Sequence, residues 1–142
     1  MKDIQSVQQE LIEEFALFED WMERYEHMIA LGKSLPLIDP SLKTDDKLIK
    51  GCQSKVWLHS EMKDGKVQFT ADSDAIITKG IVAILVRVFS NQKPEDIVKA
   101  NTNFIDEIGL KEHLSPTRAN GLVSMLKQMK LYAVAYQAQL NQ

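Results

Sequence analysis

Apolar side chains at the start of the chain recur every three or four residues, which is the spacing of one helix face. Asp20 followed by Glu23 has the form of a capping box, which typically begins a new helix. The pattern therefore predicts two helices, over residues 3–17 and 20–31, with Gly32 ending the second. The apolar series is Ile4, Val7, Leu11, Phe15, Phe18, Met22, Tyr25 and Ile29.

The spacing of apolar residues changes from a helical to a strand-like pattern after the proline-containing connector at residues 34–40. Residues 56–62 are rich in β-forming side chains, and residues 67–71 alternate between apolar and polar positions. Asp64-Gly65 between them is typical of a tight hairpin turn. Leu48–Lys50 is expected to add a short strand before the hairpin, which gives a three-stranded antiparallel sheet in the order 1-2-3.

Helical patterns occupy the rest of the chain. Residues 75–89 are apolar on nearly every side, which predicts a buried central helix under the sheet. The acids and the serine at 72–74 are expected to cap it, because they bind free N–H groups and suit the positive helix end. Short helices are predicted from Pro94 and over residues 103–108.

The last helix is predicted from Ser115-Pro116, with serine as N-cap and proline as first helical residue, to about residue 138. A chain of 142 residues is long enough for one domain with a core and too short for two. The expected architecture is one α+β domain over residues 1–142, in two layers with helices on one face of the sheet.

Composition excludes several classes of function. The net charge is −3 and no Lys/Arg-rich tract occurs, so neither nucleic acid nor an anionic membrane is an expected partner. The longest apolar run, residues 81–86, is too short to span a bilayer. The first five residues lack the apolar region of a secretory signal. A single cysteine excludes an internal disulfide framework, and a reducing cytoplasm is the expected location.

That cysteine, Cys52, lies within Gly51-Cys52-Gln53-Ser54, just before the β-forming run. Gly51 has no Cβ, so its backbone can take a positive φ or allow another segment to approach closely. A loop that enters a strand is a position from which a side chain can reach a partner. The lysines on either side would favour the thiolate. Free cysteines are also often small buried hydrophobes, and this pattern alone leaves both interpretations open.

Hydrolysis by a Cys/His pair is a weaker alternative, because it needs a histidine beside the thiol. His59 follows the cysteine loop on the predicted strand, whereas His27 and His113 lie far away in the sequence. A zinc site is less consistent still, since one cysteine and three scattered histidines show no ligand spacing.

The segment Gly51-Cys52-Gln53-Ser54-Lys55-Val56-Trp57-Leu58 resembles the signature of the SufE family. Proteins of this family accept sulfur from cysteine desulfurases during iron–sulfur cluster assembly. The resemblance continues in family order along nearly the whole chain, which makes it far more specific than one short motif. The further segments are residues 21–25, 31–36, 72–75 with 79–80, 94–98 and 113–122.

The resemblance implies a SufE/NifU-like fold with Cys52 as the acceptor thiol. Cys52 would take the outer sulfur of a persulfide held by a SufS-type cysteine desulfurase, stimulate that enzyme, and pass the sulfur to a cluster scaffold. Pyridoxal phosphate would belong to the desulfurase, so this chain is expected to bind no cofactor or metal and to be no enzyme itself. The alternatives are a paralogous acceptor feeding another sulfur pathway, or an IscU-type scaffold, which would need several cysteine ligands.

The resemblance also implies supporting roles around the thiol for Gly51, Gln53 and Ser54. It places Asp74 near the acceptor loop or the partner interface, although a plain helix cap would also explain this acid. Arg118 falls near the third residue of the last helix, where a cation opposes the helix dipole. A compensating anion is therefore expected beside Arg118: Asp74, another acid of the chain, or a carboxylate of the partner.

Overall fold

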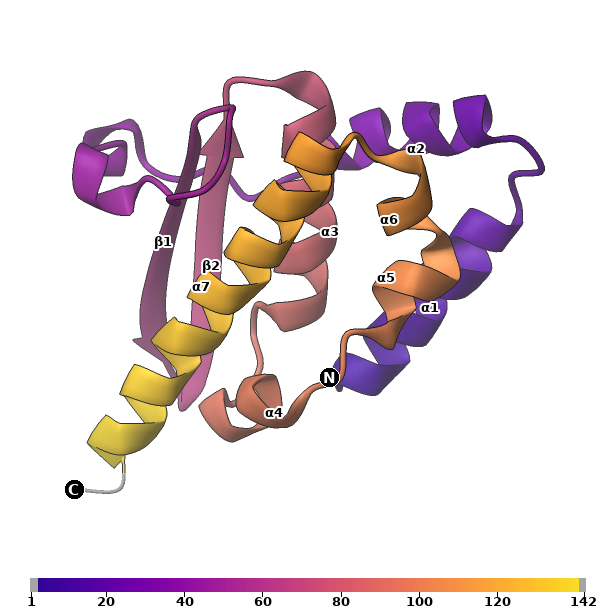
Figure 1. Cartoon of the computed structure of the whole chain (residues 1–142). Helices are drawn as coiled ribbons and strands as arrows, with labels where there is room; N and C mark the ends of the chain where they lie inside the picture. Colours follow the sequence, from indigo (N-terminus) through magenta and orange to yellow (C-terminus); the bar gives the residue numbers. More distant parts are fainter. Residues whose placement is uncertain (1–2, 141–142) are drawn as a thin grey trace.

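The computed structural model describes residues 3–140, without the side chain of Lys111, and has an α+β fold (Figure 1). Its elements in chain order are α1 (Ile4–Ala16), α2 (Trp21–Lys33), the 3-10 turns η1 (Pro40–Leu42) and η2 (Asp45–Lys47), β1 (Val56–Lys63), β2 (Lys66–Ser73), α3 (Ile76–Phe89), α4 (Pro94–Lys99), α5 (Asn103–Ile108), α6 (Leu110–His113) and α7 (Pro116–Leu140). All predicted helices are present. The short α6 was not predicted.

The second helix begins as predicted but does not end as predicted. The Asp20 carboxylate accepts a hydrogen bond from the Glu23 N–H at 2.8 Å, which is the expected cap. Gly32 lies inside α2 and does not terminate it. A Cβ on Gly32 would lie 3.1 Å from the Gly80 nitrogen, and one on Gly80 only 2.4 Å from the Met28 carbonyl oxygen. The two glycines therefore allow α2 and α3 to cross at close range.

β1 and β2 form an antiparallel hairpin with an unbroken register from Val56↔Ser73 to Lys63↔Lys66. The two turn residues, Asp64 and Gly65, have φ values of +55° and +78°. Positive φ at both central residues is the geometry of a type I′ turn, whose twist matches that of the paired strands. The predicted hairpin is confirmed.

The prediction of a third strand is wrong, because the sheet of the described residues has two strands. Leu48 makes only an isolated bridge to Trp57, and the Ile49 N–H donates to the Val56 carbonyl at 2.9 Å. The η2 turn ends at Lys47 and Gly51 takes a positive φ, so the extended segment between them is too short for a ladder.

α3 is the buried central helix that the sequence predicts. It contacts β2 on one side and α1 and α2 on the other, so the N-terminal helices add to the two predicted layers (Figure 1). α7 lies across the sheet beside α3, and its Tyr136 hydroxyl is 3.0 Å from the Ser60 hydroxyl of β1. No helix among residues 3–140 has both the length and the apolar character needed to cross a membrane.

Candidate functional site

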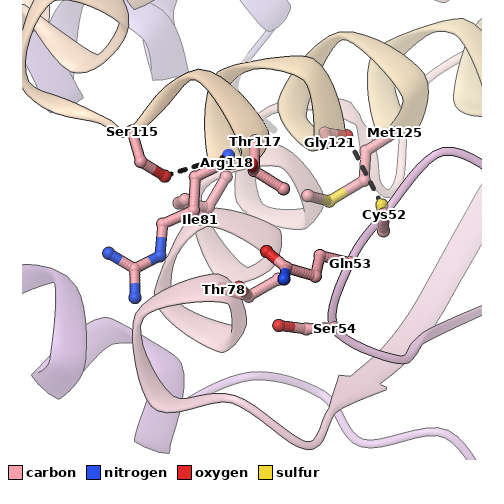
Figure 2. A pocket seen from close by; sticks show the side chains of 10 residues that line it. All are labelled: Cys52, Gln53, Ser54, Thr78, Ile81, Ser115, Thr117, Arg118, Gly121 and Met125. Atoms are coloured by element: carbon pink, nitrogen blue, oxygen red, sulfur yellow. Dashed lines mark hydrogen bonds between the residues drawn. The ribbon is translucent and has the colours of Figure 1, made fainter.

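Cys52 opens onto a cavity of about 290 Å³ between its own loop, the start of α3 and the first turns of α7 (Figure 2). The predicted residues Gln53, Ser54 and Arg118 also line this cavity. Sequence reasoning missed the walls that the two helices supply: Thr78 and Ile81 from α3, and Ser115, Thr117, Gly121 and Met125 from α7. A glycine inside a long helix weakens it, so Gly121 was the one signal that another segment approaches α7 there.

The thiol is partly buried against α7. Its Sγ lies 3.7 Å from the Gly121 carbonyl oxygen, to which the S–H donates a weak hydrogen bond. A Cβ on Gly121 would lie 3.4 Å from Sγ, so the missing side chain leaves just enough room for the sulfur. Burial raises the pKa of the Cys52 thiol, because the charged thiolate loses solvation. Burial in this site therefore favours the neutral thiol over the thiolate.

This pKa direction predicts slow alkylation of the folded protein near neutral pH. The rate of reaction with iodoacetamide should follow the thiolate fraction, so its midpoint should lie above the ~8.5 of an ordinary thiol. The same chain unfolded in urea provides the matched control and should titrate near the ordinary value. A midpoint pH for the folded protein at or below that of the unfolded chain would show that burial does not raise the pKa of Cys52.

Gly51 has both a positive φ and a close approach of another segment, the two features that its missing Cβ permits. Its φ is +92°, and a Cβ built there would lie 2.6 Å from the Ser124 hydroxyl of α7. The loop backbone therefore rests directly on α7 immediately before the thiol. Any larger residue would be strained by this φ, and its Cβ would require the Ser124 side chain to move.

The acids at the start of α3 do not cap it, which corrects the prediction for residues 72–74. Asp72 and Ser73 belong to β2, and the N-cap residue Ala75 makes no side-chain cap. Asp72 instead contacts two ammonium groups, Lys43 at 2.5 Å and Lys79 at 3.3 Å. Partial burial alone would raise the pKa of Asp72, but hydrogen bonds from Lys43, Ser73 and Lys79 bring it below its ordinary value.

Asp74 closes the end of the cysteine loop and does not line the cavity. Its carboxylate accepts the Lys55 N–H at 3.0 Å, and its own N–H donates to the Lys55 carbonyl at 3.2 Å. This reciprocal pair fixes the point at which the loop enters β1. Asp74 thus lies next to the loop, one of the two positions that the resemblance implied.

Arg118 is exposed at the rim of the cavity, with its guanidinium directed away from Cys52 (Figure 2). The backbone N–H of Arg118 donates a hydrogen bond to the Ser115 hydroxyl at 3.3 Å, which confirms the predicted cap of α7. Among the described residues, no ion pair involves Arg118. Within residues 3–140, no acid therefore supplies the intramolecular anion that the sequence suggested, and Asp74 is hydrogen-bonded to the Lys55 backbone.

The described residues show neither a histidine among the residues that line the Cys52 cavity nor a metal-binding cluster. His59 Nε2 lies 2.8 Å from Glu61 on the same strand, and His59 is not among the residues that line the Cys52 cavity. Within residues 3–140, no cluster of three or more His, Cys, Asp or Glu side chains is arranged to hold a metal ion.

The single cysteine of the chain thus lies on a cavity between its own loop and two helices. Residues 9–133 match the family described as "SufE: Fe-S metabolism associated domain". The chain belongs to the SufE family, which confirms the resemblance. Its role lies in iron–sulfur metabolism, where proteins of this family act as sulfur-transfer partners.

Curated relatives agree with this assignment. The chain is 38% identical to an uncharacterized SufE-like protein of Rhizobium meliloti, over 85% of this chain and 90% of the relative. It is 35% identical to an uncharacterized SufE-like protein of Synechocystis, over 89% of this chain and 80% of the relative. It is also 35% identical to the chloroplastic/mitochondrial SufE-like protein 1 of Arabidopsis thaliana, over 89% of this chain but only 34% of that longer protein.

The fold recurs in a solved structure. The solution structure of a hypothetical protein from Thermus thermophilus superimposes with a TM-score of 0.78, covering 93% of this chain and 96% of the other. The sequence identity is 19%, so this likeness supports the α+β fold alone.

Proposed function

We propose that this protein accepts persulfide sulfur on Cys52 from a SufS-type cysteine desulfurase, stimulates that enzyme, and delivers the sulfur to a cluster scaffold. The observation that carries the proposal is the placement of the chain's single thiol on a loop that lines an open cavity. Pyridoxal phosphate would stay on the desulfurase, and a reducing cytoplasm would keep Cys52 free to react.

The proposed transfer balances without an added oxidant. The Cys52 thiolate attacks the outer sulfur of the desulfurase persulfide, and a new S–S bond forms at Cys52. The S–S bond on the desulfurase breaks, and its cysteine leaves as a thiolate. The proton that Cys52 loses is available to that leaving group. The product is a Cys52 persulfide, and the desulfurase is free to begin another turnover.

The lone thiol favours a carrier over the alternatives. A persulfide on a chain with a single cysteine has no internal thiol to convert it into a disulfide, so the sulfur persists until another protein removes it. An IscU-type scaffold would need several cysteine ligands. A paralogous acceptor would use the same transfer step and differ only in the protein that finally receives the sulfur.

Mass spectrometry under non-reducing conditions tests the proposal. After incubation with a desulfurase, pyridoxal phosphate and cysteine, the protein should gain the mass of one sulfur atom, and peptide mapping should place it on Cys52. Incubation without the desulfurase is the control and should give no gain. A wild-type protein that neither gains sulfur nor stimulates the desulfurase would overturn the proposal, and iron bound after anaerobic reconstitution would favour a scaffold.

Arg118→Ala is expected to weaken desulfurase stimulation without unfolding the protein. Arg118 is exposed beside the cavity and has no ion-pair partner among residues 3–140, so a carboxylate of the desulfurase is the expected anion. Loss of one exposed, charge-assisted contact should raise the half-saturating concentration about two- to fivefold. Lys93→Ala, an exposed cation at α4, is the matched control. Equal stimulation by both variants would remove Arg118 from the interface.

A further inference from the structure

A second depression adjoins the cysteine loop. It is a groove of about 420 Å³ between residues 46–50, which lead directly into Gly51 and Cys52, and the middle of α7. Ser124 lines this groove and also lies against the Gly51 backbone. Gly121 and Met125, on the same stretch of α7, line the cavity of Cys52. One stretch of α7 therefore contributes to both depressions.

The charge of the groove is opposite to that of the whole chain. Lys47, Lys50 and Lys127 line it, with Asp46 as the one carboxylate among its lining residues. None of these three lysines takes part in an ion pair within the described part of the chain. The Thr44 hydroxyl donates to Asp46 and holds the pKa of that carboxyl below its ordinary value. The groove thus has a surplus of two positive charges on a protein of net charge −3.

The groove also borders exposed apolar surface. Leu131 lines it and is 51% exposed. Val123 and Val134, at 50% and 48%, continue the surface along α7. Val134 lies three residues after Leu131 and therefore neighbours it on the helix surface, whereas Val123 lies about two turns earlier on α7. Apolar side chains flanked by unpaired cations fit a segment that carries both carboxylates and hydrophobic residues.

We propose that this groove docks an acidic segment, bearing apolar side chains, of the partner that donates sulfur to Cys52. This inference rests on the proposed function. It assigns binding of the sulfur donor to a surface that is separate from the cavity of the reacting thiol. Binding beside residues 46–50 would hold the sulfur-donating partner next to the segment that leads into Gly51 and Cys52. The lysines would act mainly at encounter, because charges at the rim of an interface increase association rates in a salt-dependent way.

The double variant Lys47→Glu/Lys127→Glu tests the inference and leaves Lys50, the lysine closest to the thiol in sequence, unchanged. The half-saturating concentration for desulfurase stimulation should rise about five- to thirtyfold at low salt. The difference should shrink as salt rises, because the screening length falls from about 10 Å at 0.1 M to about 3 Å at 1 M. The matched control is Lys33→Glu/Lys93→Glu, which makes the same charge change at exposed positions on α2 and before α4.

Two further measurements keep the outcomes distinct. Reaction of Cys52 with a low-molecular-weight persulfide should be equal in the groove variant and the wild type, which shows an intact loop. A groove variant that stimulates the desulfurase like its control would overturn the inference. So would a variant defective only in delivery to the scaffold, because the groove would then serve the acceptor. A wild-type protein that takes no sulfur from the desulfurase would instead overturn the proposed function.

Discussion

Cys52→Ser is expected to abolish sulfur acceptance and to reduce desulfurase stimulation to background. Serine is close to cysteine in size and directs its hydroxyl toward the Gly121 carbonyl, which lies 3.7 Å from the cysteine sulfur, so the loop is expected to keep its position against α7. An alcohol is not ionised near neutral pH and does not attack persulfide sulfur. The change should therefore remove the chemistry while altering the free energy of unfolding by no more than about 1 kcal/mol.

The decisive measurement is desulfurase turnover at saturating concentrations of each variant. Cys52→Ala serves as the matched second variant, because it lacks both the thiol and a hydroxyl. Both should give the turnover of the desulfurase alone, with urea unfolding curves close to that of the wild type. Stimulation that survives in both variants would show that docking, and not removal of sulfur, activates the enzyme.

Gly80→Ala is expected to destabilise the fold by about 1–3 kcal/mol, the usual cost of forcing extra atoms into a packed core. The new Cβ would lie 2.4 Å from the Met28 carbonyl oxygen and 2.8 Å from its carbon. Both are backbone atoms of α2, so no side-chain rotation can relieve the contact. The direction is diagnostic, because alanine in an unconstrained helix would stabilise it by about 1 kcal/mol relative to glycine.

Urea unfolding at constant m-value measures this change directly. Gly32→Ala is the graded comparison: its Cβ would lie 3.1 Å from Gly80, so a smaller loss is expected. Ile76→Ala, at an exposed position of α3, should shift stability by no more than about 0.5 kcal/mol. A Gly80→Ala protein as stable as the wild type would mean that the α2–α3 crossing tolerates a wider separation than the structure indicates.

Local patterns predicted the elements of this fold well. The Asp64-Gly65 turn requires positive φ at both residues, a demand that only a few residue types meet, and it was correctly located. The apolar run of α3 likewise needs only its own composition to be recognised as buried. Leu48–Lys50 was wrongly predicted as a strand, because an extended segment becomes a strand only where enough backbone groups find partners.

Residues whose role depends on distant contacts were harder to predict. Gly32 was predicted to end a helix, whereas its function is fixed by Gly80, 48 positions away in the sequence. Asp72 fits a helix cap on local grounds, yet Lys43 and Lys79 reach it from two other segments. The cysteine motif gave Cys52, Gln53 and Ser54, but the α3 and α7 walls of the cavity depend on tertiary packing.

The partly buried position of Cys52 also bears on its chemical selectivity between protein partners and small thiols. To reduce a persulfide, a competing thiol must bring its sulfur into line with the S–S bond. The α7 backbone at Gly121 covers one side of Cys52, which restricts the directions of approach. Under the proposed function, the fold would favour partners that bind the loop and position their sulfur, and would protect the cargo from freely diffusing thiols.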